Sequence, residues 1–241
     1  MSQALARAPL YARVERIITD RIADRTWPPG HMLPSENDLA AELGVSQGTV
    51  RRALDALFRR HVVERRQGRG TFVASHTSER ALFHFFHLTD LAGGISAPTS
   101  RVLSLAREGA TAEEAARLAL KAGAAVIRIG RVRLLRGVAR VAETIALPAA
   151  RFRGFRLPVG EEMQDELYVH YQRHFGVSVA RAEDALSAAE ATAEEAAMLG
   201  VAPRAPLLVV ERVARDLAGR PVEWRVSRVD TRALRYRVAL E

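Results

Sequence analysis

A pair of short predicted helices separated by a tight turn constrains this chain more than any other feature. The hydroxyl of Ser35 can cap the first helix, with Asp38 completing a variant of the capping box, and Gly44 ends that helix. Ser46 caps the second helix. Its apolar side chains recur at helical spacing, at Val50, Ala53, Leu54, Leu57 and Phe58. Two helices joined by Gly44 and Val45 have the spacing of a helix-turn-helix.

The segments on either side extend this unit into a winged helix. Residues 9–26 are expected to be helical. They carry one apolar stripe, formed by Leu10, Val14, Ile17, Ile18 and Ile22. After the helix-turn-helix, two short strands are expected at His61–Arg65 and Gly70–Ala74, joined by the basic hinge Gln67-Gly68-Arg69. Three helices and a β-hairpin make a winged-helix DNA-binding domain, which we place at residues 1–75.

Arginine is concentrated in this part of the chain. Between Gly44 and His76 there are seven arginines and two acidic residues, so this stretch contributes +5 of the net charge of +8. A basic surface suits a polyanionic partner, and the alternative is that these arginines form a solvated face. The position of the arginines carries the argument rather than their number, because a GC-rich genome also favours arginine over lysine.

The stretch from Pro9 to Val73 resembles the DNA-binding domain of the GntR family of bacterial transcription regulators. The motifs LPSE..LA, GVS..TVR.AL and GRGTFV occur in the order and spacing of that family. The resemblance implies sequence-specific binding to double-stranded DNA. Many family members have arginine where Gln47 stands, and some have one where Asn37 stands. Because amides pair best with adenine, we expect an operator that depends less on guanine at those positions.

The helix after Ser46 and the hairpin supply the candidate DNA contacts. Gln47, Thr49 and Arg51 face base edges, and Arg51 is placed to reach guanine or a phosphate. Gly68 permits a close approach of the backbone, and Arg69 can enter the minor groove. The candidate DNA-binding residues are Ser35, Asn37, Ser46, Gln47, Thr49, Arg51, Arg52, Gly68, Arg69 and Thr71.

Composition excludes several classes of protein. The 241 residues, of which 48% are hydrophobic, are enough for two packed domains. The absence of cysteine excludes a disulfide scaffold, thiolate catalysis and cysteine-ligated metals. No apolar run approaches the roughly 18 residues that a membrane span needs, and the N-terminus lacks the apolar stretch of a signal peptide. We therefore expect a cytoplasmic protein. The resemblance to GntR regulators further implies a bacterial protein that associates with the nucleoid when it binds DNA.

The rest of the chain mixes strands and helices. Residues 76–98 are expected to form a linker, and residues 99–241 a second domain. Strands are predicted near 100–107, 125–136, 138–147, 178–189, 206–217 and 221–230, and helices at 111–121, 161–175 and 192–199. Short turns at Gly137 and Gly219 indicate antiparallel pairing, so the fold class is α+β. Similar helix starts at Thr111 and Thr192, each followed by a hairpin, indicate an internal duplication.

This second part resembles the UTRA effector domain of the HutC-type GntR subfamily. The matching stretches are PTSRVLSL, IRIGRVRLLRGVARVAETIALP, ELYVHYQRHFGV and PLLVVERVARDLAGRPVEWRVSRVD. The resemblance implies a chorismate-lyase-like antiparallel sheet with helices, a small metabolite as effector, and a homodimer. Two winged helices then face a palindromic operator. We expect a repressor of a catabolic or transport operon whose DNA binding the metabolite modulates.

Strand alternation gives independent evidence for a ligand site. Arg131 and Arg133 share a strand face with apolar residues, as does Glu143 on the next strand, so the three charges should converge on one side of the sheet. Two interpretations are open. The arginines and the glutamate form either a buried ion pair that only stabilises the fold, or a pocket that binds a ligand. In the pocket, arginine holds an anionic group and Glu143 binds a hydroxyl or amine. The resemblance favours an effector site formed by Arg131, Arg133, Glu143, Tyr168 and Glu223.

Two glutamates, Glu223 and Glu166, bear on the position of this site and on the ligand that it binds. Alternation alone places Glu223 in solvent, because its strand neighbours Arg225 and Ser227 are polar. The family often has a hydroxyl residue where Glu166 stands, and its sugar-phosphate binders use that residue near the phosphate. Because a glutamate repels phosphate, we expect a small carboxylate or an amine-bearing metabolite rather than a sugar phosphate.

No metal, cofactor or catalytic residue is predicted. The pairs His84/His87 and His170/His174 lack a carboxylate partner and are expected to pack or face solvent. The sequence contains no Ser/His/Asp arrangement, phosphate-cradling glycine loop or dinucleotide fingerprint. Two alternatives stay open: an enzyme of lyase-like fold with an appended DNA-binding domain, and a non-specific nucleoid binder. The latter leaves the second domain unexplained.

Overall fold

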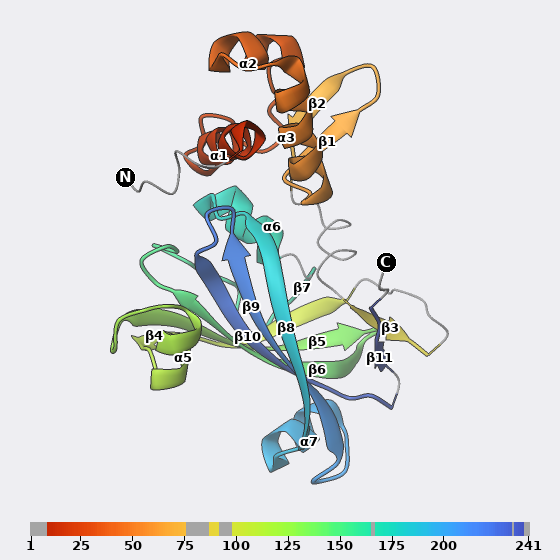
Figure 1. Cartoon of the computed structure of the whole chain (residues 1–241). Helices are drawn as coiled ribbons and strands as arrows, with labels where there is room; N and C mark the ends of the chain where they lie inside the picture. Colours follow the sequence, from red (N-terminus) through yellow and green to blue (C-terminus); the bar gives the residue numbers. More distant parts are fainter. Residues whose placement is uncertain (1–8, 76–86, 92–97, 165–166, 233, 239–241) are drawn as a thin grey trace. The chain divides into compact units, whose positions relative to one another are not determined.

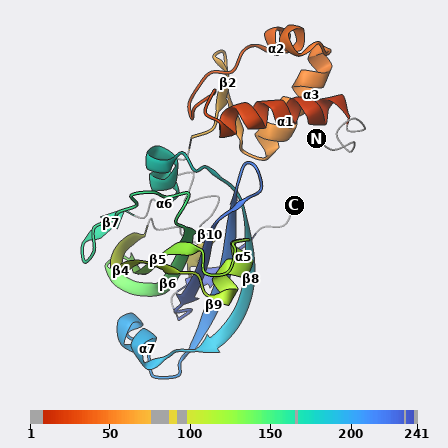
Figure 2. The same cartoon turned by 90° about the vertical axis from the view of Figure 1, so that its left-hand side faces the viewer.

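The computed structural model describes residues 9–75, 87–91, 98–164, 167–232 and 234–238, and the chain divides into two compact units, Met1–His76 and Thr77–Glu241. Figures 1 and 2 show the elements of both units from two directions. The first unit is mainly helical, and the second is built on a large antiparallel sheet.

The first unit is a winged helix, as predicted. Its elements are α1 (Leu10–Ala23), α2 (Glu36–Leu43), α3 (Gln47–Arg59), β1 (Val63–Arg66) and β2 (Gly70–Val73). Ser35 and Ser46 cap α2 and α3 by accepting hydrogen bonds from the backbone N–H groups of Asp38 and Thr49. The buried apolar side chains of the helices include Val14, Ile18, Leu39, Val50, Leu54 and Leu57.

A seven-stranded antiparallel sheet forms the second unit, in the order β7-β4-β5-β6-β10-β9-β8. The strands are β4 (Thr99–Gly109), β5 (Ala125–Leu135), β6 (Val138–Pro148), β7 (Glu162–Gln164), β8 (Val179–Glu190), β9 (Pro206–Asp216) and β10 (Pro221–Val229). Gly137 and Gly219 close the β5–β6 and β9–β10 hairpins at positive φ, which glycine adopts without strain. The predicted α+β class and antiparallel pairing are confirmed.

Two short helices cover one face of this sheet. α5 (Ala112–Arg117) and α7 (Ala193–Leu199) each begin with a capping box at Thr111 and Thr192. In each box the threonine hydroxyl accepts a hydrogen bond from the backbone N–H of the glutamate three residues later, and the carboxylate of that glutamate accepts one from the threonine N–H. Apolar contacts hold this face: Leu118 clusters with Val126 and Ala146, and Leu199 with Val132, Leu134 and Leu207. Each helix precedes a hairpin, so the predicted helix-then-hairpin order occurs twice.

Two segments cover the opposite face. α6 (Leu167–His170) and the π-helical turn η2 (Tyr171–Phe175) share a buried cluster with the sheet residues Ile129 and Ile145. β3 (Leu88–Asp90) and β11 (Leu234–Tyr236) pair as a two-stranded ribbon and share a second cluster with Val141 and Val229. Because side chains alternate along a strand, Ile145 and Val141 lie on the same face of β6. Charged residues occupy the sheet between these two apolar clusters.

Several predicted helices are shorter in the structure. The helix predicted at 161–175 begins instead as strand β7, which pairs with β4 at the edge of the sheet, and helical structure starts at Leu167. The helices predicted at 111–121 and 9–26 end early, before Ala119 and Arg25, which both take positive φ.

The segment predicted as a linker contains structure of the second unit. Leu88–Asp90 is strand β3, paired with β11 from the far end of the chain. Residues 76–86 and 92–97, including His84, lie outside the described residues.

Candidate functional site

The ten candidate DNA-binding residues lie on the surface of the first unit. Eight are exposed, and Thr49 and Thr71 are half-buried. They come from the start of α2, the first part of α3 and the β1–β2 hairpin. Ser35 and Ser46 are also helix caps, so their hydroxyls already accept backbone hydrogen bonds.

Most arginines near this surface have partners within the unit. Three of the ion pairs join Arg60 to Glu15, Arg65 to Asp55 and Arg66 to Glu64. The Arg52 guanidinium lies 4.2 Å from the centre of the Tyr11 ring. Arg69 differs, because its exposed guanidinium makes no hydrogen bond or ion pair with any residue that the structure describes. It stands at the hairpin tip, next to Gly68, whose φ of 68° forms the turn.

Two candidate base-reading side chains share one partner. Arg51 Nε and Nη2 both lie 2.9 Å from Glu36 Oε2, and Gln47 Nε2 donates to the same oxygen at 3.3 Å. Sequence reasoning missed Glu36. The available signal was its position directly after the cap Ser35, where the helices of the motif approach each other.

In the second unit, a row of polar side chains crosses the sheet between the two apolar clusters. Arg131 on β5 lies opposite Glu143 on β6, which lies opposite Ser227 on β10. Arg131 Nε donates to Glu143 Oε2 at 2.6 Å, and Ser227 Oγ donates to Glu143 Oε1 at 2.8 Å. Arg133 Nε and Arg225 Nη1 lie 3.5 and 3.6 Å from the same carboxylate. The three charges expected to converge therefore do so, and Arg225 joins them.

Glu223 is fully buried beside this row. It accepts hydrogen bonds from the hydroxyls of Tyr168 and Tyr171, at 3.0 and 2.8 Å, and from Arg225 Nη2 at 2.9 Å. The expectation from alternation that Glu223 faces solvent is wrong, because α6 and η2 cover the polar side of β10. Tyr171 was not predicted, although it follows Tyr168 by one helical turn.

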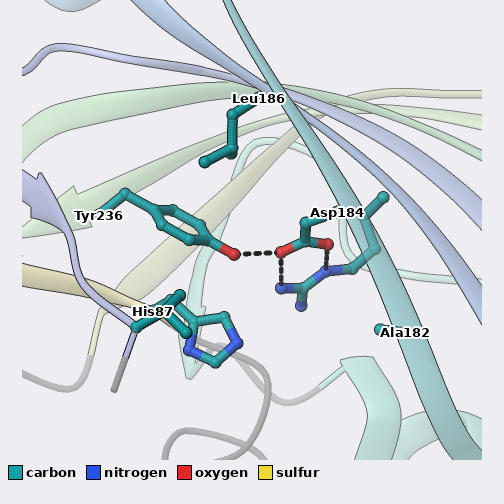
Figure 3. Close-up of a pocket in the computed structure, with 7 residues that line it drawn as sticks. His87, Ala182, Asp184, Leu186 and Tyr236 are labelled. Atoms are coloured by element: carbon teal, nitrogen blue, oxygen red, sulfur yellow. Dashed lines mark hydrogen bonds and ion pairs between the residues drawn. The ribbon is translucent and has the colours of Figure 1, made fainter. Parts of the chain in front are cut away.

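A third carboxylate, that of Asp184, extends the cluster to β8 and β9, and Figure 3 shows its hydrogen bond with Tyr236. Arg212 Nε and Nη2 donate to the two oxygens of Asp184, each at 2.6 Å, and the Tyr236 hydroxyl donates to Asp184 Oδ2. Arg212 lies opposite Arg225 in the sheet, which joins this pair to the row. Sequence reasoning missed these residues, although Asp184 shares its strand face with Ala182 and Leu186.

Two adjoining cavities open onto the cluster. One has a volume of about 330 Å³ and is lined by His87, Ala182, Asp184, Leu186, Arg212, Tyr236 and Val238. The other, of about 30 Å³, is lined by His87, Leu88, Arg133, Glu143, Val210, Arg212, Arg225, Ser227 and Tyr236. The smaller cavity has room for about one water molecule. His87, Arg212 and Tyr236 line both cavities.

The surroundings fix the protonation states of this cluster. Burial alone would raise the pKa of Glu143, but the guanidiniums around it, that of Arg131 first, hold that pKa below its ordinary range. Burial and the charge of Glu223 raise the pKa of Tyr168 to about 12, so its phenol stays protonated. Burial and the nearby Arg212 lower the pKa of His87, which favours a neutral imidazole. The site therefore offers cationic donors and anionic acceptors to one ligand.

The histidines do not gather with other metal ligands in the described part of the chain. The rings of His170 and His174 lie 4.5 Å apart, and burial lowers the pKa of His170. Among described residues, no group of three or more His, Cys, Asp or Glu could hold a metal ion. Within the same residues, no helix has the length and apolar character of a membrane span. Glu166 is outside the described residues.

Comparison with known proteins agrees with both units. The model of bacterial regulatory proteins of the gntR family matches residues 10–73, and the UTRA domain model matches residues 96–235, more than half of the chain. The chain belongs to the GntR family. Its winged helix followed by a UTRA domain is the HutC-type arrangement, and the chain is a DNA-binding transcription regulator with an effector domain.

Individual relatives of this GntR regulator include repressors. It is 32% identical to the HTH-type transcriptional repressor NagR of Bacillus subtilis over 209 residues, covering 85% of this chain and 83% of the relative. It is 40% identical to the histidine utilization repressor of Pseudomonas putida over 117 residues, covering 48% and 47%. The ligand-binding domain of a GntR-family regulator from Bordetella bronchiseptica is 33% identical. It aligns with a TM-score of 0.59, over 66% of this chain and 98% of that domain.

Proposed function

We propose that this GntR regulator is a repressor that binds a palindromic operator as a homodimer and leaves it when a small metabolite binds in the second unit. The observation that carries the proposal is the buried cluster of arginines and carboxylates beside two adjoining cavities. NagR and the histidine utilization repressor are named as repressors, which supports negative control of a catabolic or transport operon. Membership of a regulator family favours effector binding over catalysis.

The cavity walls define the chemistry of the effector. Arg133, Arg212 and Arg225 bring guanidiniums to the smaller cavity, and Glu143 brings a carboxylate. The Nε of Arg225 is buried without a hydrogen-bond partner among the described residues. A buried donor left unsatisfied costs about 1–3 kcal/mol, which an acceptor on the ligand would recover. We therefore infer a small metabolite that carries a carboxylate, or an amine directed at Glu143. A sugar phosphate is disfavoured because Glu166 stands where the sugar-phosphate binders of the family use a hydroxyl residue near the phosphate, and a glutamate repels a dianion.

Binding would couple the effector to the β3–β11 ribbon. An effector of several heavy atoms does not fit the smaller cavity unless His87 and Tyr236 move and merge it with the larger one. β3 follows the segment that leads from the first unit, so a shift of the ribbon is a route from the effector to the winged helix. A coupling free energy of about 1–3 kcal/mol is enough to change operator occupancy severalfold or more.

The test measures binding to the DNA upstream of the protein's own gene by fluorescence anisotropy, against a scrambled duplex, at a fixed salt concentration. A panel of carboxylates, amines, amino acids and sugar phosphates is added in turn. We expect preference for the upstream DNA, lost in the presence of one carboxylate or amine. Equal binding to both duplexes that no compound changes would refute the proposal. Turnover of a chorismate-like compound would instead support an enzyme.

A further inference from the structure

Glu36 contacts both side chains that α3 is expected to present to base edges. It is the first residue of α2, whereas Gln47 and Arg51 lie one turn apart at the start of α3. The same Glu36 oxygen accepts hydrogen bonds from both, at 3.3 Å from Gln47 and 2.9 Å from Arg51. The Glu36 side chain is 25% exposed and that of Arg51 is 58% exposed, so the contact lies at the surface that DNA would approach.

This contact leaves a defined edge of Arg51 available. Glu36 takes the edge formed by Nε and Nη2, so Nη1 and the second hydrogen of Nη2 stay directed away from the carboxylate. Two guanidinium N–H groups on one edge match the O6 and N7 acceptors of guanine. A side chain already held in place loses less conformational freedom when it binds a base.

The negative charge of Glu36 lowers the affinity of the protein for DNA of any sequence. Phosphate attraction supplies most of the affinity for non-specific sequences, and a carboxylate at the interface reduces it. Glu36 also stands in the first turn of α2, where the helix dipole stabilises a negative charge.

We propose that Glu36 is a positioning residue for sequence recognition. It orients Arg51 and Gln47 for base contacts and weakens binding to DNA in which those contacts cannot form. The inference rests on the proposed operator binding. Its signature is that neutralising Glu36 weakens binding to the operator without weakening binding to other DNA, whereas a purely structural role would weaken both.

The test compares Glu36→Gln with the wild-type protein on an operator duplex and on a scrambled duplex. The operator is obtained by selection from random DNA with the wild-type protein, and binding is measured by anisotropy at several salt concentrations. We expect operator affinity to fall by about tenfold or more, as for one bidentate base contact. Affinity for the scrambled duplex should stay the same or rise. In a background that carries both Gln47→Ala and Arg51→Ala, Glu36→Gln should lower operator affinity no further.

Glu42→Gln is the matched control. Glu42 lies on the same helix but pairs with Arg21 of α1, away from α3. The same change of charge should therefore leave the ratio of operator to scrambled affinity unchanged. An unchanged ratio for Glu36→Gln would overturn the inference, and tighter operator binding would show that Glu36 competes with DNA for Arg51.

A measurement without DNA separates this inference from the proposed function. The Arg51 Nε–H resonance should exchange with water more slowly in the wild-type protein than in Glu36→Gln, because Glu36 holds that hydrogen. Equal exchange rates would overturn the positioning role whether or not an operator is found. A wild-type protein that selects no sequence would refute the proposed function instead.

Discussion

Replacing Glu143 with glutamine removes the charge at the centre of the buried cluster. The Glu143 side chain is 1% exposed, and its carboxylate lies 2.6 Å from Arg131 Nε. Arg133 and Arg225 approach it within 3.6 Å, and Ser227 donates a hydrogen bond at 2.8 Å. The substitution keeps the shape of the side chain, so it tests charge rather than packing.

The expected loss follows from the burial of the partners. Removing one member of a buried ion pair costs about 3–5 kcal/mol, because the remaining charge loses its counterion in a medium that solvates it poorly. Glutamine keeps a carbonyl oxygen that can accept from Ser227, a bond worth about 1 kcal/mol. We therefore expect the lower end of the range, about 3 kcal/mol of unfolding free energy at pH 7.

The pH dependence of this loss has a defined sign. The pKa of Glu143 in the folded protein lies below the value of 4.5 that an unperturbed glutamate has. The stability that it contributes is fully present above pH 4.5 and is lost as the pH falls, because the unfolded chain takes up the proton first. The difference in unfolding free energy between the two proteins should be constant near neutrality and shrink below pH 4.5.

Urea denaturation followed by Trp224 fluorescence measures these quantities. The chain has two tryptophans, so a Trp27→Phe background makes the signal specific to the second unit. Glu190→Gln is the control, because its ion pair with Arg204 is exposed to solvent and should contribute little to stability. A loss below about 1 kcal/mol for Glu143→Gln, or a difference that widens on acidification, would refute the reasoning.

Three further substitutions test other parts of the two sites. Arg225→Lys should abolish the effect of the effector on operator affinity, because an ammonium cannot bridge Glu143 and Glu223 as the guanidinium does, while effector-free DNA binding stays unchanged. A retained response in the anisotropy assay would contradict the assigned site. Tyr171→Phe removes the hydroxyl that donates to Glu223 and should lower stability by about 1–3 kcal/mol, seen as a lower urea midpoint. An unchanged midpoint would show that the bond is not needed. Arg69→Ala should weaken binding to operator and scrambled duplexes alike and reduce the salt slope by about 1. An unchanged slope would mean that the hairpin tip does not contact phosphate.

Local sequence signals were sufficient where the cause acts over a few residues. The predicted caps form at Ser35, Ser46, Thr111 and Thr192. A cap and its partner lie three residues apart, so the rest of the fold has little influence on them. Alternation likewise placed Arg131 and Glu143 on one face, because both strands pair through the short turn at Gly137.

The sequence-based predictions that were wrong share one cause, which is contact with a segment far away in the chain. Strand alternation alone placed Glu223 in solvent, but α6 and η2, about fifty residues earlier in the chain, cover its side of β10. Residues 162–164 were predicted to be helical, but they form a strand because they pair with the edge of β4. Leu88–Asp90 belongs to the second unit only because β11, near the other end of the chain, pairs with it.

The sequence by itself determined the winged helix, the antiparallel α+β class and the basic start of the recognition helix, because caps, periodicity and glycine turns act locally. Only the tertiary structure decided which charges meet. Glu36 contacts Arg51 across the turn of the helix-turn-helix, and Asp184 contacts Arg212, which lies directly opposite it on the neighbouring strand. These contacts depend on helix packing and strand register, and a shift of register by one residue would turn each side chain to the other face.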